Sequence, residues 1–334
     1  MIKYLSLFSG IGAPEQALKN IGIDYDLVGF SEVDKYAIQS YCAVHDADII
    51  LDHLGDITKI DIDSLPANEI DLITHGSPCQ DFSVAGNNKG GDEGSGTRSS
   101  LMWNTVKIVE RCKPKYVLWE NVKNVLSKKH KHNFDKYINE MNRIGYNNYY
   151  KVLNSQNYGV PQNRDRVFTI SIRKDVNKNF EFPQGHKSEI KLKDILEDNV
   201  DESYYKFTDR ALSIIDEIYI KGAIYFRVKE ATKKGYALAS EGDSINMNYP
   251  GSASKRGRVG KNSCHTLSTQ CEFSVIQNDK MRMLTPLECW RLMGFKDEQF
   301  YKAAKVCSNS QLYKQAGNSI VVNVLEEIFK NLFK

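Results

Sequence analysis

Residues 4–21 read YLSLFSGIGAPEQALKNI, which is a short apolar run, a glycine turn and a segment with helical periodicity. Tyr4–Phe8 predicts a strand and Glu15–Ile21 a helix, with Pro14 near the first helical turn, where proline is favourable. Apolar runs continue to alternate with helical segments up to about residue 175. This alternation is typical of a parallel sheet flanked by helices, so we predict an α/β fold.

Further elements follow on the C-terminal side of this stretch. Strands are expected at Leu27–Phe30, Ile70–Thr74 and Tyr116–Trp119, and a helix at Leu101–Arg111. Ser319–Phe333 predicts a closing helix that packs back on the first domain.

The chain changes character from about residue 176 to 280, where periodicity is weak and Lys, Gly, Ser and Tyr are frequent. Residues 251–258 read GSASKRGR, which is typical of an inserted lobe. We therefore expect two domains. Residues 1–175 together with 312–334 form the larger one, and residues 176–311 form the smaller one.

Composition limits the class of protein. The 334 residues are 41% hydrophobic and 26% charged, enough for one sizeable core and a second lobe, while the net charge of +3 is too small to indicate a polyanionic partner. There is no apolar run of ~18 residues and no signal peptide, so we expect no membrane contact and a cytoplasmic location. The seven cysteines include no Cys-x-x-Cys pair, which indicates reduced thiols and no metal site.

The residues that can carry chemistry follow the predicted strands. The loop Phe8–Gly12 follows the first strand, Glu32 the second, Cys79 the third and Glu120 the fourth. In an open parallel sheet the carboxyl ends of the strands form one crevice where ligands bind. The fold prediction therefore places all four features at one edge.

The glycine loop and Glu32 together predict a nucleoside cofactor. Glycines allow the backbone to approach a ligand, and Glu32 lies 20 residues after Gly12, a spacing at which a carboxylate accepts hydrogen bonds from ribose hydroxyls. The third glycine of the dinucleotide fingerprint is missing, which argues against a nicotinamide dehydrogenase. Asp56 is either an acceptor for an adenine amino group or an ordinary turn residue.

Six motifs in order resemble those of the cytosine-5 DNA methyltransferase family, of the prokaryotic or phage type with a single target recognition domain. They are Phe8–Gly12, Gly76–Gln80 (GSPCQ), Glu120–Val122, Gln162–Arg166 (QNRDR), Arg282–Phe295 (RMLTPLECWRLMGF) and Gln315–Ser319 (QAGNS). The resemblance implies a Rossmann-like methyltransferase domain that binds S-adenosylmethionine, and it implies that the smaller domain is the target recognition domain.

The family chemistry explains these residue types. Carbon 5 of cytosine is a poor nucleophile until a thiolate adds at carbon 6, and the resemblance assigns this addition to Cys79. Glu120 would contact ring nitrogen 3 and the exocyclic amine. Arg164 and Arg166 would brace the site, Arg166 being the better candidate for touching the base. Taken singly, Glu120 is equally an ordinary strand-end charge, and the two arginines a solvated hairpin edge.

The remaining site residues carry over from the same motifs and from the inserted lobe. The cofactor set is Phe8, Ser9, Gly10, Ile11, Gly12, Glu32, Val33, Asp56, Ile57, Pro78, Leu101, Asn318 and Ser319. The DNA-binding set is Gln80, Ser83, Arg98, Lys255, Arg256, Arg258 and Lys261, although each basic residue is equally a solvated surface charge. We expect Asp81–Ser100 to be the segment that closes over a flipped nucleotide.

The expected partner is double-stranded DNA, bound by a monomer in a restriction-modification, phage self-protection or orphan methylation role. A cognate restriction endonuclease would share the system without direct contact. Two other functions compete, namely a transfer-RNA cytosine-5 methyltransferase and a catalytically inactive DNA-binding relative. The Gly-Ser-Pro-Cys context and the long insert favour DNA, and the presence of Cys79 and Glu120 argues against an inactive relative.

Overall fold

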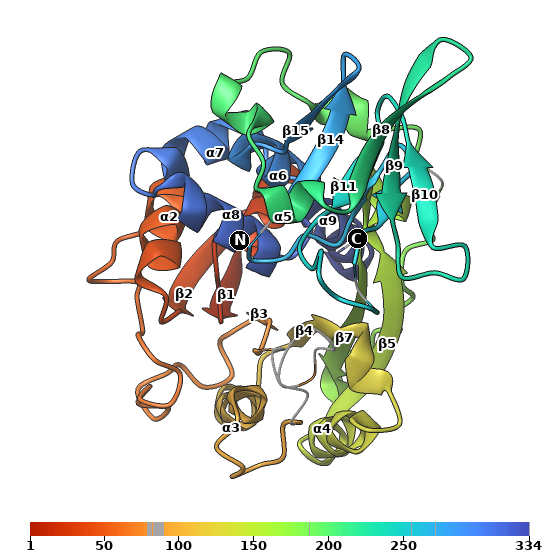
Figure 1. Cartoon of the computed structure of the whole chain (residues 1–334). Coiled ribbons are helices and arrows are strands. Elements are labelled where there is room, and N and C mark those ends of the chain that lie inside the picture. Colours follow the sequence, from red (N-terminus) through yellow and green to blue (C-terminus); the bar gives the residue numbers. More distant parts are fainter. Residues whose placement is uncertain (79–81, 83–89, 187, 255, 271, 334) are drawn as a thin grey trace. The chain divides into compact units, whose positions relative to one another are not determined.

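A computed structural model describes residues 1–78, 82, 90–186, 188–254, 256–270 and 272–333 (Figure 1). Its contacts divide the chain into two compact units. Unit 1 comprises Met1–Leu153, Asp165–Gly185 and Val324–Lys334, and unit 2 comprises Asn154–Arg164 and His186–Asn323. This grouping differs from the expected domains in two ways: residues 154–164 and 312–323 lie with the smaller unit, and residues 176–185 lie with the larger one. The functional division of the chain stays a prediction.

Unit 1 is built on a six-stranded sheet. Its spatial order is β2 (Tyr25–Ser31), β1 (Ile2–Leu7), β3 (Leu72–His75), β4 (Tyr116–Val122), β7 (Asp165–Arg173) and β5 (Tyr146–Asn154). Strands β2, β1, β3 and β4 run parallel, whereas β7 pairs antiparallel with β4 (Figure 1). The predicted α/β fold with a mostly parallel sheet is confirmed, and each of the four predicted strands is present.

Helices join the parallel strands, as crossover connections require. They are α1 (Ala13–Asn20), α2 (Lys35–His45) and α3 (Met102–Cys112), while α4 (Lys131–Arg143) leads from β4 to β5. The 3₁₀ turns of unit 1 are η1 (Arg98–Leu101), η2 (Lys123–Leu126) and η4 (Lys174–Val176), and η3 (Ser155–Tyr158) belongs to unit 2. Pro14 stands in the first turn of α1, as predicted. Asp34 caps α2 by accepting hydrogen bonds from the backbone N–H groups of Tyr36 and Ala37.

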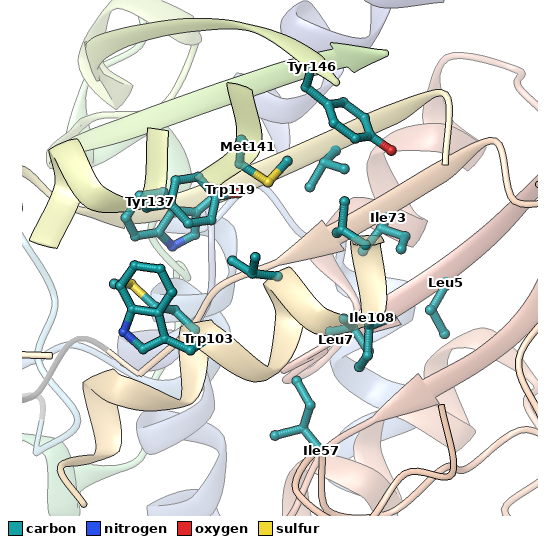
Figure 2. Packing of buried hydrophobic residues seen from close by; sticks show 14 of the residues in the cluster. Leu5, Leu7, Ile57, Ile73, Trp103, Ile108, Trp119, Tyr137, Met141 and Tyr146 are labelled. Atoms are coloured by element: carbon teal, nitrogen blue, oxygen red, sulfur yellow. The ribbon is translucent and has the colours of Figure 1, made fainter. Parts of the chain in front are cut away.

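The main core of unit 1 lies between the sheet and helices α3 and α4. Ile108 of α3 and Tyr137 and Met141 of α4 pack with Ile73 of β3 and Trp119 of β4, and all are buried (Figure 2). The apolar residues of α3 and α4 recur at helical spacing, so each helix turns one apolar face toward the sheet. This packing fixes the carboxyl ends of β3 and β4, where the candidate site lies.

The predicted closing helix is α9 (Val322–Phe333), which begins three residues later than expected because Ser319 is extended and ends the preceding helix. Asn20 of α1 donates to the Glu326 carboxylate at 2.6 Å. The ring of Phe333 meets Tyr116 edge-on at 5.4 Å. The helix therefore packs on the first domain, as predicted.

Unit 2 contains short strands and short helices, which explains its weak periodicity. One sheet has the strand order β10 (Tyr236–Ala239), β9 (Ala223–Lys229) and β8 (Ile215–Ile220). A second sheet has the order β12 (Val259–Gly260), β11 (Ser244–Asn246), β14 (Phe273–Gln277) and β15 (Lys280–Met283). A third, two-stranded sheet pairs β13 (Cys264–His265) with β6 (Gln162–Asn163). The helices are η5 (Leu192–Ile195), η6 (Glu202–Tyr205), α5 (Asp209–Leu212), α6 (Pro286–Leu292), α7 (Asp297–Ala304) and α8 (Asn309–Asn318). Within the described part of the chain, no helix is long and apolar enough to cross a membrane.

Candidate active site

The glycine loop after β1 has a backbone path that requires glycine. Phe8, Gly10 and Gly12 all have left-handed φ angles, of 54°, 57° and 76°. A Cβ on Gly12 would lie 2.1 Å from Nε2 of His45. The same nitrogen donates a hydrogen bond to the carbonyl oxygen of Ile11 at 3.0 Å. Any side chain at position 12 would therefore displace His45 and strain the turn.

Glu32, at the end of β2, is held against this loop. Its Oε2 accepts a hydrogen bond from the Gly10 backbone N–H at 2.9 Å, and its Oε1 accepts from Val33 (2.8 Å) and Asp34 (2.9 Å). The predicted spacing of 20 residues thus brings the carboxylate to the glycine turn. Val33 is 70% exposed beside it, and its role as a cofactor contact stays a prediction.

Asp56 and Ile57 follow at the next turn along the same edge. The Ser31 hydroxyl donates to the Gly55 carbonyl at 2.7 Å, which ties this turn to the end of β2. The Thr58 backbone N–H and hydroxyl both donate to the Asp56 carboxylate at 2.9 Å, and these bonds hold the pKa of Asp56 below its usual range. Asp56 is therefore a charged acceptor, although its bonds to Thr58 also fit the turn-residue interpretation.

The Gly-Ser-Pro turn after β3 is fixed by side chains from β4 and η1. Trp119 donates from Nε1 to the Ser77 hydroxyl oxygen at 3.0 Å, and Asn121 donates from Nδ2 to the Ser77 carbonyl oxygen at 3.2 Å. The Ser99 hydroxyl donates to the Pro78 carbonyl oxygen at 2.8 Å. Cys79, Gln80 and Ser83 lie outside the described residues, so their predicted roles stay predictions.

Glu120 and Arg166 form an ion pair at the same edge, with Nε of Arg166 3.0 Å from Oε1 of Glu120. The antiparallel register explains the contact. Val122 lies opposite Arg166 and Glu120 opposite Phe168, so Glu120 and Arg166 are diagonal neighbours on one face. Their side chains are 11% and 15% exposed, which leaves the pair accessible to a ligand.

Arg164 has different surroundings, although it stands only two residues before Arg166. Its side chain is buried in unit 2, where it donates to the carbonyl oxygens of Leu267 (3.3 Å), Gly317 (3.0 Å) and Ser319 (2.7 Å). Arg164 thus binds the backbone that carries Asn318 and Ser319 at the end of α8. The two arginines of the QNRDR motif therefore differ: Arg166 lies beside a carboxylate, and Arg164 binds the backbone of loops.

The other predicted contacts are spread over both units. Arg98 is exposed in η1, and Leu101, at the end of that turn, is half-buried. In unit 2, Arg256 and Arg258 are half-buried, and Lys255 lies outside the described residues. The Lys261 ammonium group lies 2.6 Å from the Asp243 carboxylate, whose side chain is 2% exposed. Lys261 therefore has a structural partner, and its role as a DNA contact stays a prediction.

Several side chains that support the site were not predicted from the sequence. They are Ser77, which lies inside the GSPCQ motif, Trp119, which ends a predicted strand, Ser99, which lies in the predicted closing segment, and His45, which lies in no predicted motif. Among the other cysteines, burial raises the pKa of Cys112 to about 11, which fits a packing role. The described residues contain no cluster of three or more His, Cys, Asp or Glu side chains that could hold a metal ion.

Comparison with known proteins identifies the family. The family described as C-5 cytosine-specific DNA methylase matches residues 2–334. The chain belongs to this family. The Type II methyltransferase M2.ScrFI of Lactococcus lactis subsp. cremoris is 35% identical to this methylase, over 100% of this chain and 99% of the relative. The orphan methyltransferase M.SPRI of Bacillus phage SPR is also 35% identical, over 99% and 97%.

A solved structure with the same fold is a DNMT2 variant from Spodoptera frugiperda. It superposes with a TM-score of 0.70 at 21% identity and covers 100% of both chains. The predicted membership of the cytosine-5 DNA methyltransferases and the predicted fold are both confirmed. Full-length similarity to DNA methyltransferases does not favour the transfer-RNA alternative.

Proposed function

We propose that this methylase acts on cytosine in duplex DNA with Cys79 as the covalent nucleophile. The observation that carries the proposal is the gathering of the Ser77–Pro78 turn and the Glu120–Arg166 pair at one sheet edge. His75 pairs with Trp119 in the β3–β4 register, so the residues that follow these strands are neighbours. The sequence continues from Pro78 directly into Cys79.

The glycine loop fits S-adenosylmethionine, which when bound supplies an electrophilic methyl group. Apart from Gly10 and its two chain neighbours, no described residue has an atom within 4 Å of the position that a Gly10 Cβ would take, so the loop backbone is open to a ligand there. Glu32 is the proposed acceptor for the ribose hydroxyls. The proposed apolar contacts for the adenine are Val33, which is 70% exposed, and Ile57, which is 5% exposed. Phe8, Ser9, Ile11, Gly12, Asp56, Pro78, Leu101, Asn318 and Ser319 complete the proposed cofactor set.

In the proposed mechanism, the Cys79 thiolate adds to carbon 6 of the cytosine, which makes carbon 5 nucleophilic. Glu120 delivers a proton to ring nitrogen 3 and so relieves the negative charge that develops on the ring. Arg166 donates to the Glu120 carboxyl and fixes its orientation, and Arg164 holds the loops of unit 2. After methylation, loss of the proton on carbon 5 and expulsion of Cys79 restore the aromatic ring.

The target carbon is inaccessible inside a base stack, so the nucleotide must rotate out of the duplex. We assign DNA contacts to Gln80, Ser83 and Arg98 near the nucleophile and to Lys255, Arg256, Arg258 and Lys261 in the recognition domain. We further propose a monomer that serves a restriction-modification, phage self-protection or orphan role, with no direct contact to a restriction endonuclease.

The test is transfer of a labelled methyl group from S-adenosylmethionine to duplex DNA or to transfer RNA, with Cys79→Ser run in parallel. Label on carbon 5 of DNA cytosine, reduced at least about 1,000-fold in the variant, is expected. Cys79→Ser should still bind DNA and melt like the unaltered chain. Label only on RNA, or full activity of the variant, would refute the proposal.

A further inference from the structure

Buried side chains bind the turn that precedes Cys79 at three separate acceptors. The Ser77 hydroxyl oxygen accepts from Trp119 (3.0 Å) and from Asn121 (3.4 Å), and the Ser77 carbonyl accepts from Asn121 (3.2 Å). The Pro78 carbonyl accepts from Ser99 at 2.8 Å. All four residues other than Pro78 are at most 3% exposed, so water does not compete for these bonds.

Proline makes these side-chain bonds necessary. Pro78 has no backbone N–H, so the turn has one fewer donor of its own to fix its path. The Pro78 carbonyl belongs to the planar peptide unit that leads into Cys79, and the bond from Ser99 restrains one side of that unit. Ser77 restrains the other side of the proline through Trp119 and Asn121.

Packing around the indole ring fixes the direction in which Trp119 donates its hydrogen bond to Ser77. His75 stacks on the Trp119 ring with an interplanar angle of 4° and a centroid distance of 5.9 Å. Tyr137 lies 4.3 Å from the same ring and Phe134 lies 5.8 Å from it, and Figure 2 shows Trp119 beside Tyr137 in the core. The indole therefore has little freedom to rotate away from Ser77.

We propose that Trp119 and Ser77 form a positioning pair that sets where the Cys79 sulfur meets carbon 6 of the cytosine. The pair acts through the turn and touches neither substrate nor cofactor. This inference rests on the proposed role of Cys79. A nucleophile must be held within a few tenths of an ångström of its productive position, and a shift of about 1 Å costs about 100-fold in rate. Loosening the turn should therefore slow the chemical step.

The experiment uses Trp119→Phe and Ser77→Ala in the full chain. Phenylalanine retains most of the ring packing and removes the N–H, while alanine removes its acceptor. We expect kcat for methyl transfer to duplex DNA to fall about tenfold in each variant, with KM for DNA changed less than about twofold. The double variant should be no slower than the slower single variant, because the bond that Trp119→Phe removes is already lost in Ser77→Ala.

Tyr146→Phe is the matched control. Tyr146 belongs to the same buried cluster (Figure 2), and its hydroxyl donates to the Pro114 carbonyl at 2.7 Å, just before the other end of β4. This variant also loses one buried hydrogen bond from an intact ring, but it lies away from the turn. Its kcat per folded molecule should stay within about twofold of the unaltered chain, with the folded fraction measured by thermal melting.

The outcomes separate this inference from the proposed function. If the unaltered chain methylates DNA and Trp119→Phe or Ser77→Ala matches its kcat, the positioning pair is wrong while the function stands. Equal losses in Tyr146→Phe, or additive losses in the double variant, would also refute the pair. A chain that fails to methylate DNA, or an active Cys79→Ser, would overturn both.

Discussion

The ion pair Glu120–Arg166 of unit 1 and the ion pair Glu288–Arg282 of unit 2 contain the same two residue types in different surroundings. The first pair is 11% and 15% exposed at a strand end, whereas the second is fully buried. Glu288 also accepts hydrogen bonds from the backbone N–H groups of Thr285 (2.8 Å) and Glu197 (2.9 Å). A buried carboxylate bound on both oxygens can hold a fold together but cannot reach a substrate.

The two pairs differ in burial rather than in residue type, and on this ground we propose a catalytic role for Glu120 and a structural one for Glu288. Both ion pairs belong to motifs that the sequence shares with one family. The motif match alone therefore does not distinguish the roles of the two pairs. The difference can be tested by changing each carboxylate to its uncharged amide.

The largest effect is expected for Glu120→Gln. The amide keeps the size of the side chain but cannot deliver the proton to ring nitrogen 3, so kcat should fall about 1,000-fold. The free energy of unfolding should change by less than about 1 kcal/mol, because the pair is partly solvated. Steady-state kinetics and urea unfolding measure the two quantities. An unchanged kcat in this variant would contradict the proposed difference in role between the two ion pairs.

Glu288→Gln should give the opposite result. Arg282 would keep its charge in a fully buried position without its carboxylate, and the free energy of unfolding should fall by about 3 kcal/mol. Urea unfolding measures this loss, and kcat per folded molecule should stay near that of the unaltered chain. A large fall in kcat with unchanged stability would mean that this pair also serves the chemistry.

His75 extends the comparison, because it is a buried titratable group that lies just before the turn of unit 1. Burial lowers the pKa of His75 to about 3 from an ordinary value of 6.5, so the unfolded chain takes up a proton that the folded chain does not. Stability should therefore be lost as pH falls below about 6.5, by about 1.4 kcal/mol per pH unit until about pH 3.

The measurement is urea unfolding of the unaltered chain and of His75→Gln between pH 7 and pH 5. The variant lacks the titrating ring, so its stability should fall less steeply with acid. Parallel slopes for the two proteins would contradict the lowered pKa of His75.

The smallest effect compares two proposed DNA-contacting cations in unit 2, one of which also has a structural partner. Lys261→Met should cost about 1 kcal/mol of stability, because Asp243 loses one of its partners, and should weaken DNA binding less than Arg258→Gln, because Asp243 already neutralises the Lys261 charge. Arg258→Gln should weaken DNA binding and lower the slope of log affinity against log salt by about 1. Urea unfolding measures the stability, and fluorescence anisotropy at several salt concentrations measures the affinity and its slope. A larger loss of slope for Lys261→Met than for Arg258→Gln would contradict this order.

Much of unit 1 could be predicted from the sequence because a parallel sheet collects the residues that follow its strands. The Glu32 contact with Gly10 is of this kind, since it depends only on strand order and spacing. The position of Arg166 could not be predicted in this way. It lies at the start of β7, and it meets Glu120 only because β7 runs antiparallel to β4, which periodicity cannot indicate.

Side-chain partnerships were harder to predict than strand ends. The bond from Trp119 to Ser77 depends on ring orientation, which packing against His75 and Tyr137 determines. The partner of Lys261 likewise comes from another strand connection, 18 residues earlier in the chain. These contacts arise from tertiary packing, so the short sequence windows that predict strands and helices contain no signal for them.

The pairing of β6 with β13 has a consequence for how the chain folds. Gln162 lies opposite Cys264 and Asn163 opposite His265, so this small ladder closes a loop of about 100 residues. In unit 1, by contrast, Ile2 pairs with Tyr25 after a loop of about 20 residues. Because distant contacts form only after a larger loss of chain entropy, we expect the parallel sheet to assemble first and unit 2 to complete last.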